Sequence, residues 1–190
     1  MSSHFYSMMS RMKNIQRWGL MRNTRPENLS EHTLDVAFIA HALAIIRNRR
    51  FGGNVDQNAV AVAAMFHDTS EIITGDMPTP IKYYNADIKN VYKEIEGIAE
   101  KRLIGLLPED LRDDFAPVYN PDSEIQSLVK AADKISALIK CIEERNSGNL
   151  EFASAEKSTL TSIKEMNIPE ANVFLDEFIS SYSLTLDELK

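Results

Sequence analysis

The sequence predicts an all-α protein with one domain over residues 1–190. Apolar residues recur roughly every 3.6 residues, as on a helix face, and no run of any length alternates with the two-residue period of a strand. Clusters of Gly, Pro and Asn separate the helical runs. The length of 190 residues, with 44% hydrophobic and 26% charged residues, suits a single domain with a sizeable core.

Nine helical segments are predicted along the chain, and turn residues separate them. Gly52-Gly53-Asn54, Met77–Pro80 and Asn120–Asp122 are expected breakers, and Ser147-Gly148 is typical of a helix C-terminus. Residues 183–190 form a short tail that docks or frays. The segments are 5–16, 30–47, 57–67, 69–74, 86–107, 109–115, 123–146, 150–166 and 169–181.

Three of these segments carry clear apolar faces. In 30–47, Ser30 is the expected N-cap, and one face holds positions 32, 36, 39, 43 and 46. In 86–107 we expect a single face made of Ile88, Val91, Tyr92, Ile95, Ile98, Ala99 and Leu103. In 123–146 the stripe contains Ile125, Leu128, Val129, Ala132, Ile135, Leu138, Ile139 and Ile142.

The single cysteine and the length of the apolar runs limit the classes of protein to which the chain can belong. The single cysteine, Cys141, excludes an internal disulfide framework and suits a reducing compartment. The first residues, Met1–Phe5, lack the layout of a signal peptide. The longest apolar stretch, Val36–Ile46, is too short to span a bilayer. We therefore expect a cytoplasmic protein.

The net charge of −7 is unevenly distributed along the chain. Residues 1–50 hold 8 basic against 3 acidic residues, a balance of +5, whereas residues 51–190 hold 13 against 25, a balance of −12. The basic excess is compatible with local attraction of a phosphate and also with an ordinary solvated face. It lacks the density and the interleaved aromatic residues of a nucleic-acid groove, so we expect no nucleic-acid partner.

The pair His67-Asp68 is the most informative feature for function. It ends the apolar run Val60–Phe66, and an imidazole next to a carboxylate can share one divalent cation. The simpler alternative is a histidine at a helix end, hydrogen-bonded to its neighbour. The pair alone does not decide between these two interpretations.

Two further residues support the interpretation as a metal site. Asp133 lies at the margin of the apolar stripe of 123–146, where a carboxylate is costly unless it is paired or bound to a cation. Lys130 and Lys134 are alternative partners for it. His32 falls on the core-facing side of 30–47, while His41 is about half a turn away and is assigned to packing or to the surface.

These residues, in the order His32, His67-Asp68 and Asp133, resemble the signature of the HD-domain superfamily of metal-dependent phosphohydrolases. Further motifs are similar to the bacterial 5′-deoxynucleotidase family (YfbR-like) over nearly the whole chain, more weakly after about residue 145. They are Arg17–Asn23, Glu27–His32, Phe66–Glu71 and Thr74–Pro80.

The resemblance implies an all-α HD-domain helical bundle that forms a homodimer. It implies hydrolysis of deoxyribonucleoside 5′-monophosphates to deoxyribonucleosides and phosphate by a metal-activated water. One divalent ion per site, Co²⁺, Mn²⁺ or a similar metal, is held by His32, His67, Asp68 and Asp133. The implied catalytic residues are Glu71 and Arg17, and the implied substrate-binding residues are Arg17, Trp18, His32, Asp76, Met77, Pro78 and Thr79.

The chemistry of the residues is consistent with these roles. Two His and two Asp form a mixed nitrogen and oxygen site, and a metal there lowers the pKa of bound water to about 7. Glu71 follows Asp68 by three residues and suits orientation or deprotonation of that water; the alternative is a surface glutamate that caps the next turn. A guanidinium such as that of Arg17 suits neutralisation of the phosphoryl oxygens.

For two residues, a simpler structural role is an alternative to the substrate-binding role that the resemblance implies. The only tryptophan, Trp18, could pack on the sugar or base, although a lone tryptophan is by default a core residue. Asp76, in a turn after Gly75, could contact the nucleotide or cap backbone N–H groups.

Two other functions stay open on the sequence. The first is an HD phosphohydrolase that acts on a triphosphate, a cyclic nucleotide or an alarmone, although a triphosphate should require more cations than Arg17, Lys82 and Arg22 supply. The second is a non-catalytic helical protein that senses a nucleotide. For a dinuclear centre only His4 and His41 are left over, and neither fits.

Overall fold

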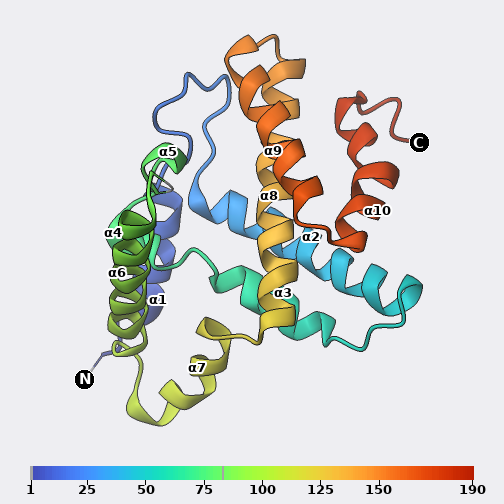
Figure 1. The fold of residues 1–190 in the computed structure, drawn as a ribbon. Helices are drawn as coiled ribbons and strands as arrows, with labels where there is room; N and C mark the ends of the chain where they lie inside the picture. Colours follow the sequence, from blue (N-terminus) through green and yellow to red (C-terminus); the bar gives the residue numbers. More distant parts are fainter. Residues whose placement is uncertain (1, 83) are drawn as a thin grey trace. The chain divides into compact units, whose positions relative to one another are not determined.

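In a computed structural model, which describes residues 2–82 and 84–190 without the side chains of Thr79 and Pro80, the chain is helical (Figure 1). The only β pairing among the described residues is an isolated antiparallel bridge between Gln16 and Asn28. The helices are α1 (Phe5–Met9), η1 (Ser10–Asn14), α2 (Leu29–Arg50), α3 (Gln57–Phe66), α4 (Glu71–Thr74), α5 (Thr79–Lys82), α6 (Ala86–Ile104), η2 (Glu109–Leu111), α7 (Arg112–Tyr119), α8 (Ser123–Asn146), η3 (Leu150–Phe152), α9 (Ala153–Glu165), α10 (Pro169–Glu177) and η4 (Ile179–Ser183). The all-α prediction is confirmed.

The chain forms two compact units, each built from separate stretches of sequence. The first contains the described residues up to Met21 with 26–33 and 66–121, and the second contains 22–25, 34–65 and 122–190. Helix α2 contributes its first turn to the first unit and its remainder to the second. The single domain over residues 1–190 stays a prediction.

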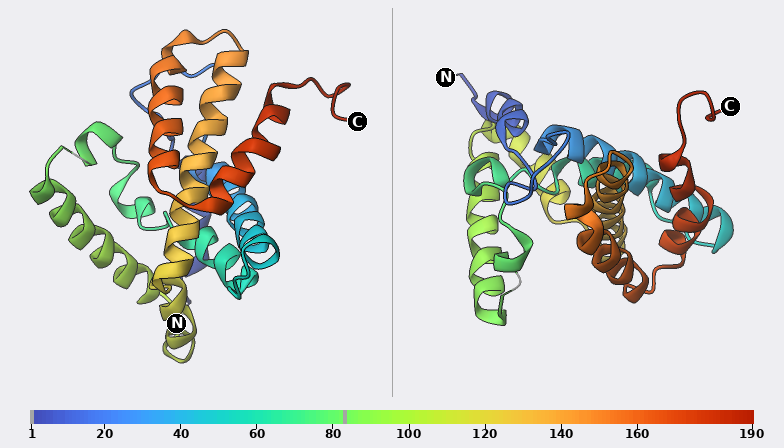
Figure 2. Two further views of the ribbon diagram at one scale, coloured as in Figure 1. Left: turned by 45° about the vertical axis from the view of Figure 1, so that its right-hand side comes forward. Right: turned by 90° about the horizontal axis from the view of Figure 1, so that it is seen from above.

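The second unit packs around α8. Helices α8 and α9 run antiparallel, side by side, and α10 follows them, as both views show (Figure 2). The predicted stripe of α8 is confirmed, because six of its eight residues are buried and Ile125 and Ile142 pack against them from the edge. Helix α2 adds Val36, Ile39 and Leu43 to the same core, so its predicted apolar face is also confirmed.

The first unit has a smaller, aromatic core. Phe5 of α1 and Leu103 of α6 are fully buried, and Leu107 joins them. The ring of Phe115 packs edge-on against Phe5 and Phe66, with centroids 5.2 and 5.9 Å apart. This cluster lies beside the end of α3, at the residue that precedes His67-Asp68.

The predicted apolar face of α6 is wrong in part. Tyr92, Ala99 and Leu103 are buried, but Val91, Ile95 and Ile98 are exposed. Val91 and Ile98 each directly precede a buried residue, and one residue turns a helix by about 100°, so both lie about 100° away from the buried positions. Ile95 follows Tyr92 by three residues and lies at the margin of the buried face, 44% exposed. The core therefore covers only one side of the predicted apolar face.

The start of α2 also differs from its prediction. The helix begins at Leu29, and Asn28, not Ser30, is the N-cap: its side-chain oxygen accepts the backbone N–H groups of Ser30 and Glu31, at 3.0 and 3.1 Å. Glu31 in turn accepts the N–H of Asn28 at 3.3 Å, which completes a capping box. His32 nevertheless lies in the first helical turn, as expected.

Most of the other boundaries agree with the prediction to within a few residues. The segment 5–16 is an α-helix that continues as a tighter 3₁₀ helix, and α5 forms a short helix where Met77–Pro80 predicts only a breaker. The predicted C-terminus of α8 is confirmed, with Gly148 in the left-handed region at φ 84°.

Helix α2 is, by length and composition alone, long and apolar enough to cross a membrane. The stretch Val36–Ile46, predicted to be too short to span a bilayer, thus lies within a helix of 22 residues. Its apolar residues Val36, Ile39 and Leu43 belong to the protein core, and buried core helices often have the same length and apolar composition.

Candidate active site

A short backbone pairing brings the Arg17 segment to the start of α2. The N–H of Arg17 donates to the carbonyl of Glu27, and the N–H of Leu29 donates to the carbonyl of Ile15, both at 2.9 Å. These bonds flank the Gln16–Asn28 bridge. As a result, Arg17 and Trp18 lie against the residues that lead into the first turn of α2, which carries His32.

Three of the proposed metal ligands converge in the first unit. Oδ2 of Asp68 lies 3.1 Å from Nε2 of His67 and 3.6 Å from Nε2 of His32, and the two imidazole rings are 5.5 Å apart between centroids. His32 is fully buried, and the other two are partly buried. The buried face of α2 and the end of α3 therefore place two imidazoles around one carboxylate oxygen.

This geometry fits a divalent cation. A metal at about 2.0–2.2 Å from nitrogen and oxygen ligands holds adjacent ligand atoms about 3.0–3.5 Å apart, close to the separations of these atoms. The candidate ligand atoms of this cluster lie within 4.8 Å of one another. The simpler interpretation, a histidine bonded only to its neighbour, does not account for His32 approaching the same oxygen.

The electrostatics favour an ionised Asp68. Burial by itself raises the pKa of this carboxyl, but His67, His32 and Arg17 together hold the pKa well below its ordinary range. Asp68 is therefore an anion, as a metal ligand must be.

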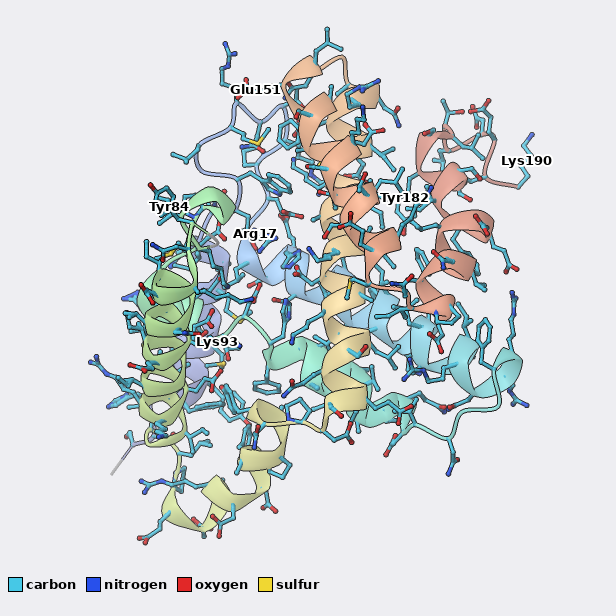
Figure 3. All side chains as sticks on the ribbon, in the orientation of Figure 1. Arg17, Tyr84, Lys93, Glu151, Tyr182 and Lys190 are labelled. Atoms are coloured by element: carbon cyan, nitrogen blue, oxygen red, sulfur yellow. The ribbon has the colours of Figure 1, made fainter. Side chains whose placement is uncertain are left out.

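The side chain of Arg17, labelled in Figure 3, lies among carboxylates of the first unit. Its Nη1 is 3.4 Å from Oδ2 of Asp68 and 4.0 Å from Oδ1 of Asp76, and its Nε donates to Glu27 at 3.3 Å. The side chain is only 12% exposed. A guanidinium is thus fixed directly beside the candidate ligand Asp68.

Glu71 is buried at the start of α4, with 3% of its surface exposed. The alternative of a surface glutamate is wrong. Among the described residues, its Oε2 has no hydrogen-bond partner. Burial, with added repulsion from Asp68 and Asp76, raises the pKa of Glu71 to about 9. A buried carboxyl oxygen without a partner, near Asp68, is suited to a water molecule or a ligand.

The loop after α4 carries Asp76 at the edge of the same cluster. Gly75 has a φ of 76°, a conformation that glycine adopts easily. Burial raises the pKa of Asp76, while Arg17 opposes this change, and the backbone N–H of Trp18 donates to its carboxylate. Asp76 thus caps a backbone N–H, as one alternative holds, and also faces Arg17. Met77 and Pro78 are partly buried, and the side chain of Thr79 is outside the described part of the chain.

Trp18 is half-buried and belongs to neither hydrophobic core, so the default core assignment is wrong. Its indole N–H donates to Oε2 of Glu27 at 2.9 Å. Its backbone lies in the left-handed region at φ 58°, which is uncommon for a residue other than glycine.

Lys82 and Arg22, the other cations considered for binding phosphate, lie in different surroundings from each other. Lys82 pairs with Glu96 at 3.0 Å; burial alone lowers the pKa of Lys82, but Glu96, Asp68 and Glu71 raise it above its ordinary value. Lys82 is therefore a permanent cation of the first unit. Arg22, in the second unit, pairs with Glu151 at 2.6 Å.

Asp133, the fourth expected ligand, lies on α8 in the second unit and is partly buried. The first unit thus brings together His32, His67, Asp68, Arg17, Trp18, Glu71 and Asp76. The sequence interpretation gave no role to Glu27, because its contacts depend on a pairing of the chain that has no periodic signal.

Comparisons with known proteins identify the family of the chain. Over residues 4–182 the chain matches the family model described as 5′-deoxynucleotidase YfbR-like. A 5′-deoxynucleotidase of Vibrio parahaemolyticus is 50% identical over 190 residues, which cover 98% of each chain.

Two solved structures share the fold. An HD-domain phosphohydrolase from Listeria innocua has a TM-score of 0.82 at 23% identity, covering 94% of this chain and 88% of its own. The HD phosphohydrolase DatZ of cyanophage S-2L, bound to dA and one catalytic Zn²⁺, has a TM-score of 0.67 at 18% identity over 92% and 96% of the two chains. These likenesses establish an HD-domain fold. Since the family model and the Vibrio relative both span nearly the whole sequence, the chain belongs to the 5′-deoxynucleotidase YfbR-like family.

Proposed function

We propose that this chain is a phosphoric monoester hydrolase that converts deoxyribonucleoside 5′-monophosphates to deoxyribonucleosides and phosphate. The observation that carries the proposal is the convergence of His32 and His67 on one oxygen of Asp68, with Arg17 beside it. Membership in a family of 5′-deoxynucleotidases supports the choice of substrate.

One divalent cation is the proposed cofactor. His32, His67 and Asp68 would hold it, with Asp133 of α8 as the fourth ligand. Two imidazoles and two carboxylates suit Mn²⁺, Co²⁺, Fe²⁺ or Zn²⁺. When bound, the cation supplies Lewis-acid chemistry, which activates a water molecule and offsets charge on the phosphate.

Glu71 is the proposed catalytic carboxyl. Its buried, unpartnered Oε2 would orient the attacking water and take its proton. A divalent cation held beside Asp68 would favour the ionised form of Glu71, which is the form that can accept a proton. In the reaction, water adds to phosphorus, the bond from phosphorus to the 5′-oxygen breaks, and a proton passes to the departing 5′-oxygen.

Arg17 is the proposed phosphate-binding residue, and His32 lies close enough to contribute. The guanidinium is half enclosed by carboxylates, so a phosphate that replaces part of these contacts gains charge-assisted hydrogen bonds. The nucleoside would be held by Trp18 and by the segment Asp76–Thr79. With Lys82 already paired to Glu96, Arg17 is the main cation for phosphate, which favours a monophosphate over a triphosphate.

The decisive experiment measures phosphate release from a panel of ribo- and deoxynucleotides, from mono- to triphosphates. The protein is first stripped with a chelator and then supplied with single metals. We expect release from the deoxyribonucleoside monophosphates alone, absent after chelation and restored by at least one of Mn²⁺, Co²⁺ or Zn²⁺.

Matched variants exclude a contaminating phosphatase. His67→Asn should abolish both release and metal retention, whereas His4→Asn, an exposed histidine near the N-terminus, should leave both unchanged. If triphosphates or cyclic nucleotides are the preferred substrates, the protein is an HD phosphohydrolase of another substrate class. If the protein binds nucleotides but turns over none of them with any metal, the alternative of a non-catalytic nucleotide sensor is favoured.

A homodimer and a cytoplasmic location are part of the same proposal, and they rest on the family resemblance. Light scattering coupled to size-exclusion chromatography tests the first, with a mass near twice 21.5 kDa expected. Fractionation of cells tests the second.

A further inference from the structure

We propose that Glu27 is a positioning residue that fixes Arg17 and Trp18 relative to each other, so that one carboxylate aligns the phosphate contact with the nucleoside contact. The inference deepens the proposed function and rests on it, because it takes Arg17 as the phosphate-binding residue and Trp18 as the nucleoside-binding one. Glu27 itself would not touch the reacting atoms.

The first observation is that a single atom serves both side chains. Oε2 of Glu27 accepts the indole N–H of Trp18 at 2.9 Å and the Nε–H of Arg17 at 3.3 Å. The Glu27 and Arg17 side chains are each 12% exposed, so water competes little for these bonds. Hydrogen bonds to an ionised carboxylate are about twice as strong as neutral ones.

The second observation is the backbone of Trp18. A left-handed conformation at φ 58° is sparsely populated by large residues and persists only where the surroundings hold it. Three contacts do so here. The indole is bound by Glu27, the N–H donates to the carboxylate of Asp76, and the carbonyl accepts the N–H of Met21 at 2.9 Å. Glu27 provides the only one of these three that acts on the indole ring.

The third observation concerns the competition for Arg17. Its Nη1 faces Asp68 at 3.4 Å and Asp76 at 4.0 Å, while Glu27 holds the opposite part of the guanidinium through Nε. Without Glu27 the guanidinium would be drawn towards Asp68 and Asp76. It would then engage a candidate metal ligand more closely and present itself less well to a phosphate.

The backbone makes Glu27 suitable for this task. Its carbonyl accepts the N–H of Arg17, next to the Gln16–Asn28 bridge, so its side chain starts from a fixed place beside Arg17. Residues held on a rigid pairing orient their neighbours with less loss of entropy than residues in mobile loops.

The test compares Glu27→Ala, which removes the acceptor, with Glu27→Gln, which retains one acceptor oxygen without the charge. Glu151→Gln is the matched control, because Glu151 (labelled in Figure 3) also accepts hydrogen bonds from an arginine in a loop, Arg22, outside the candidate site. Steady-state kinetics use a deoxyribonucleoside 5′-monophosphate and the metal that supports activity. Metal content and circular dichroism are measured on each protein.

A second readout does not need activity. Trp18 is the only tryptophan in the chain, so its fluorescence reports on this contact directly, with and without metal. We expect a shifted emission maximum and stronger quenching by acrylamide in Glu27→Ala, a smaller change in Glu27→Gln, and none in Glu151→Gln.

In the kinetics we expect kcat/KM to fall about 100-fold in Glu27→Ala and about 10-fold in Glu27→Gln, with metal content unchanged. KM should rise and kcat should fall together, because both contacts are displaced. Wild-type kinetics in Glu27→Ala, or an equal loss in Glu151→Gln, would overturn the inference. So would a kinetic loss with unchanged Trp18 fluorescence. If Glu27→Ala does not fold, Glu27→Gln decides by the same criteria.

Failure of the proposed function has a different signature. In that case the wild-type protein itself releases no phosphate from deoxynucleotides, while the fluorescence of Trp18 still responds to Glu27→Ala. An unresponsive Trp18 in an active enzyme contradicts the positioning role alone.

Discussion

Replacement of Glu144 by glutamine should destabilise the protein strongly, because the carboxylate is buried and surrounded by donors. Glu144 lies on α8 with 1% of its surface exposed. Its two oxygens accept the backbone N–H and the hydroxyl of Thr24 at 2.8 and 2.6 Å, the N–H of Arg25 at 3.2 Å and the side-chain amide of Asn149 at 2.8 Å. Lys140, one turn earlier on α8, forms an ion pair with it. All of these residues belong to the second unit.

The expected magnitude follows from this environment. Removal of one member of a buried ion pair costs about 3–5 kcal/mol, since the other charge is left without compensation. Glutamine keeps the volume of Glu144 but turns an N–H₂ group towards donors, so it does not replace the lost acceptor. For a chain of this length the same loss lowers Tm by about 6–20 °C.

The effect should depend on pH with a defined sign. Burial alone raises the pKa of Glu144, but hydrogen bonds from Lys140, Thr24 and Asn149 lower it well below its ordinary value. A carboxyl with a lowered folded-state pKa stabilises the fold above its unfolded pKa of about 4.3, and this contribution disappears as the pH falls towards the folded value. The stability gap between wild type and Glu144→Gln should therefore narrow below about pH 4.3.

Urea unfolding followed by circular dichroism, at pH 7 and at steps down to pH 3, measures this gap. Glu143→Gln, an exposed neighbour on the same helix, is the control and should change stability by no more than about 0.5 kcal/mol. The double variant Lys140→Met with Glu144→Gln should be less destabilised than the sum of the single variants. A loss below about 1 kcal/mol at pH 7, or a gap that stays constant in acid, would refute the reasoning.

Four further outcomes are expected. Glu71→Gln should keep metal and nucleotide but lose about 10²–10⁴-fold in turnover, and unchanged turnover would remove Glu71 from catalysis. Asp133→Asn should retain less metal after gel filtration, as measured by elemental analysis; full retention contradicts a ligand role. Arg17→Ala should lower kcat/KM by about 10²–10³-fold at constant metal content, and wild-type kinetics would eliminate the phosphate assignment. Asn28→Ala should cost about 1 kcal/mol in a thermal melt, because α2 loses its N-cap; an unchanged Tm would show that the cap is dispensable.

Much of the fold can be predicted from the sequence where local pattern and tertiary packing agree. Helix α8 is an example, because its stripe of Leu128, Ile135 and Leu138 is both periodic and buried. Helix α6 shows the limit. Val91 and Ile98 are as apolar as the buried residues, and the packing of α1, α4, α5 and α7 against α6 determines which face is covered.

The same limit applies to the site. His32, His67 and Asp68 are recognisable by residue type and by resemblance, and the structure brings them together. The burial of Glu71, the left-handed backbone of Trp18 and the double contact of Glu27 leave no mark on the sequence. They depend on contacts between residues nine or more positions apart, which a local pattern does not encode.

The discontinuous layout of the two units constrains how the protein can be synthesised and dissected. Each unit is assembled from three separate stretches, and the first needs residues from its N-terminal start as far as 121. The core of the first unit needs Leu103 and the core of the second needs α8, so during translation neither core can be completed until these residues have been made. No continuous fragment contains one complete unit without part of the other, so truncated genes should yield insoluble products, and folding should be slow for an all-helical chain of this size.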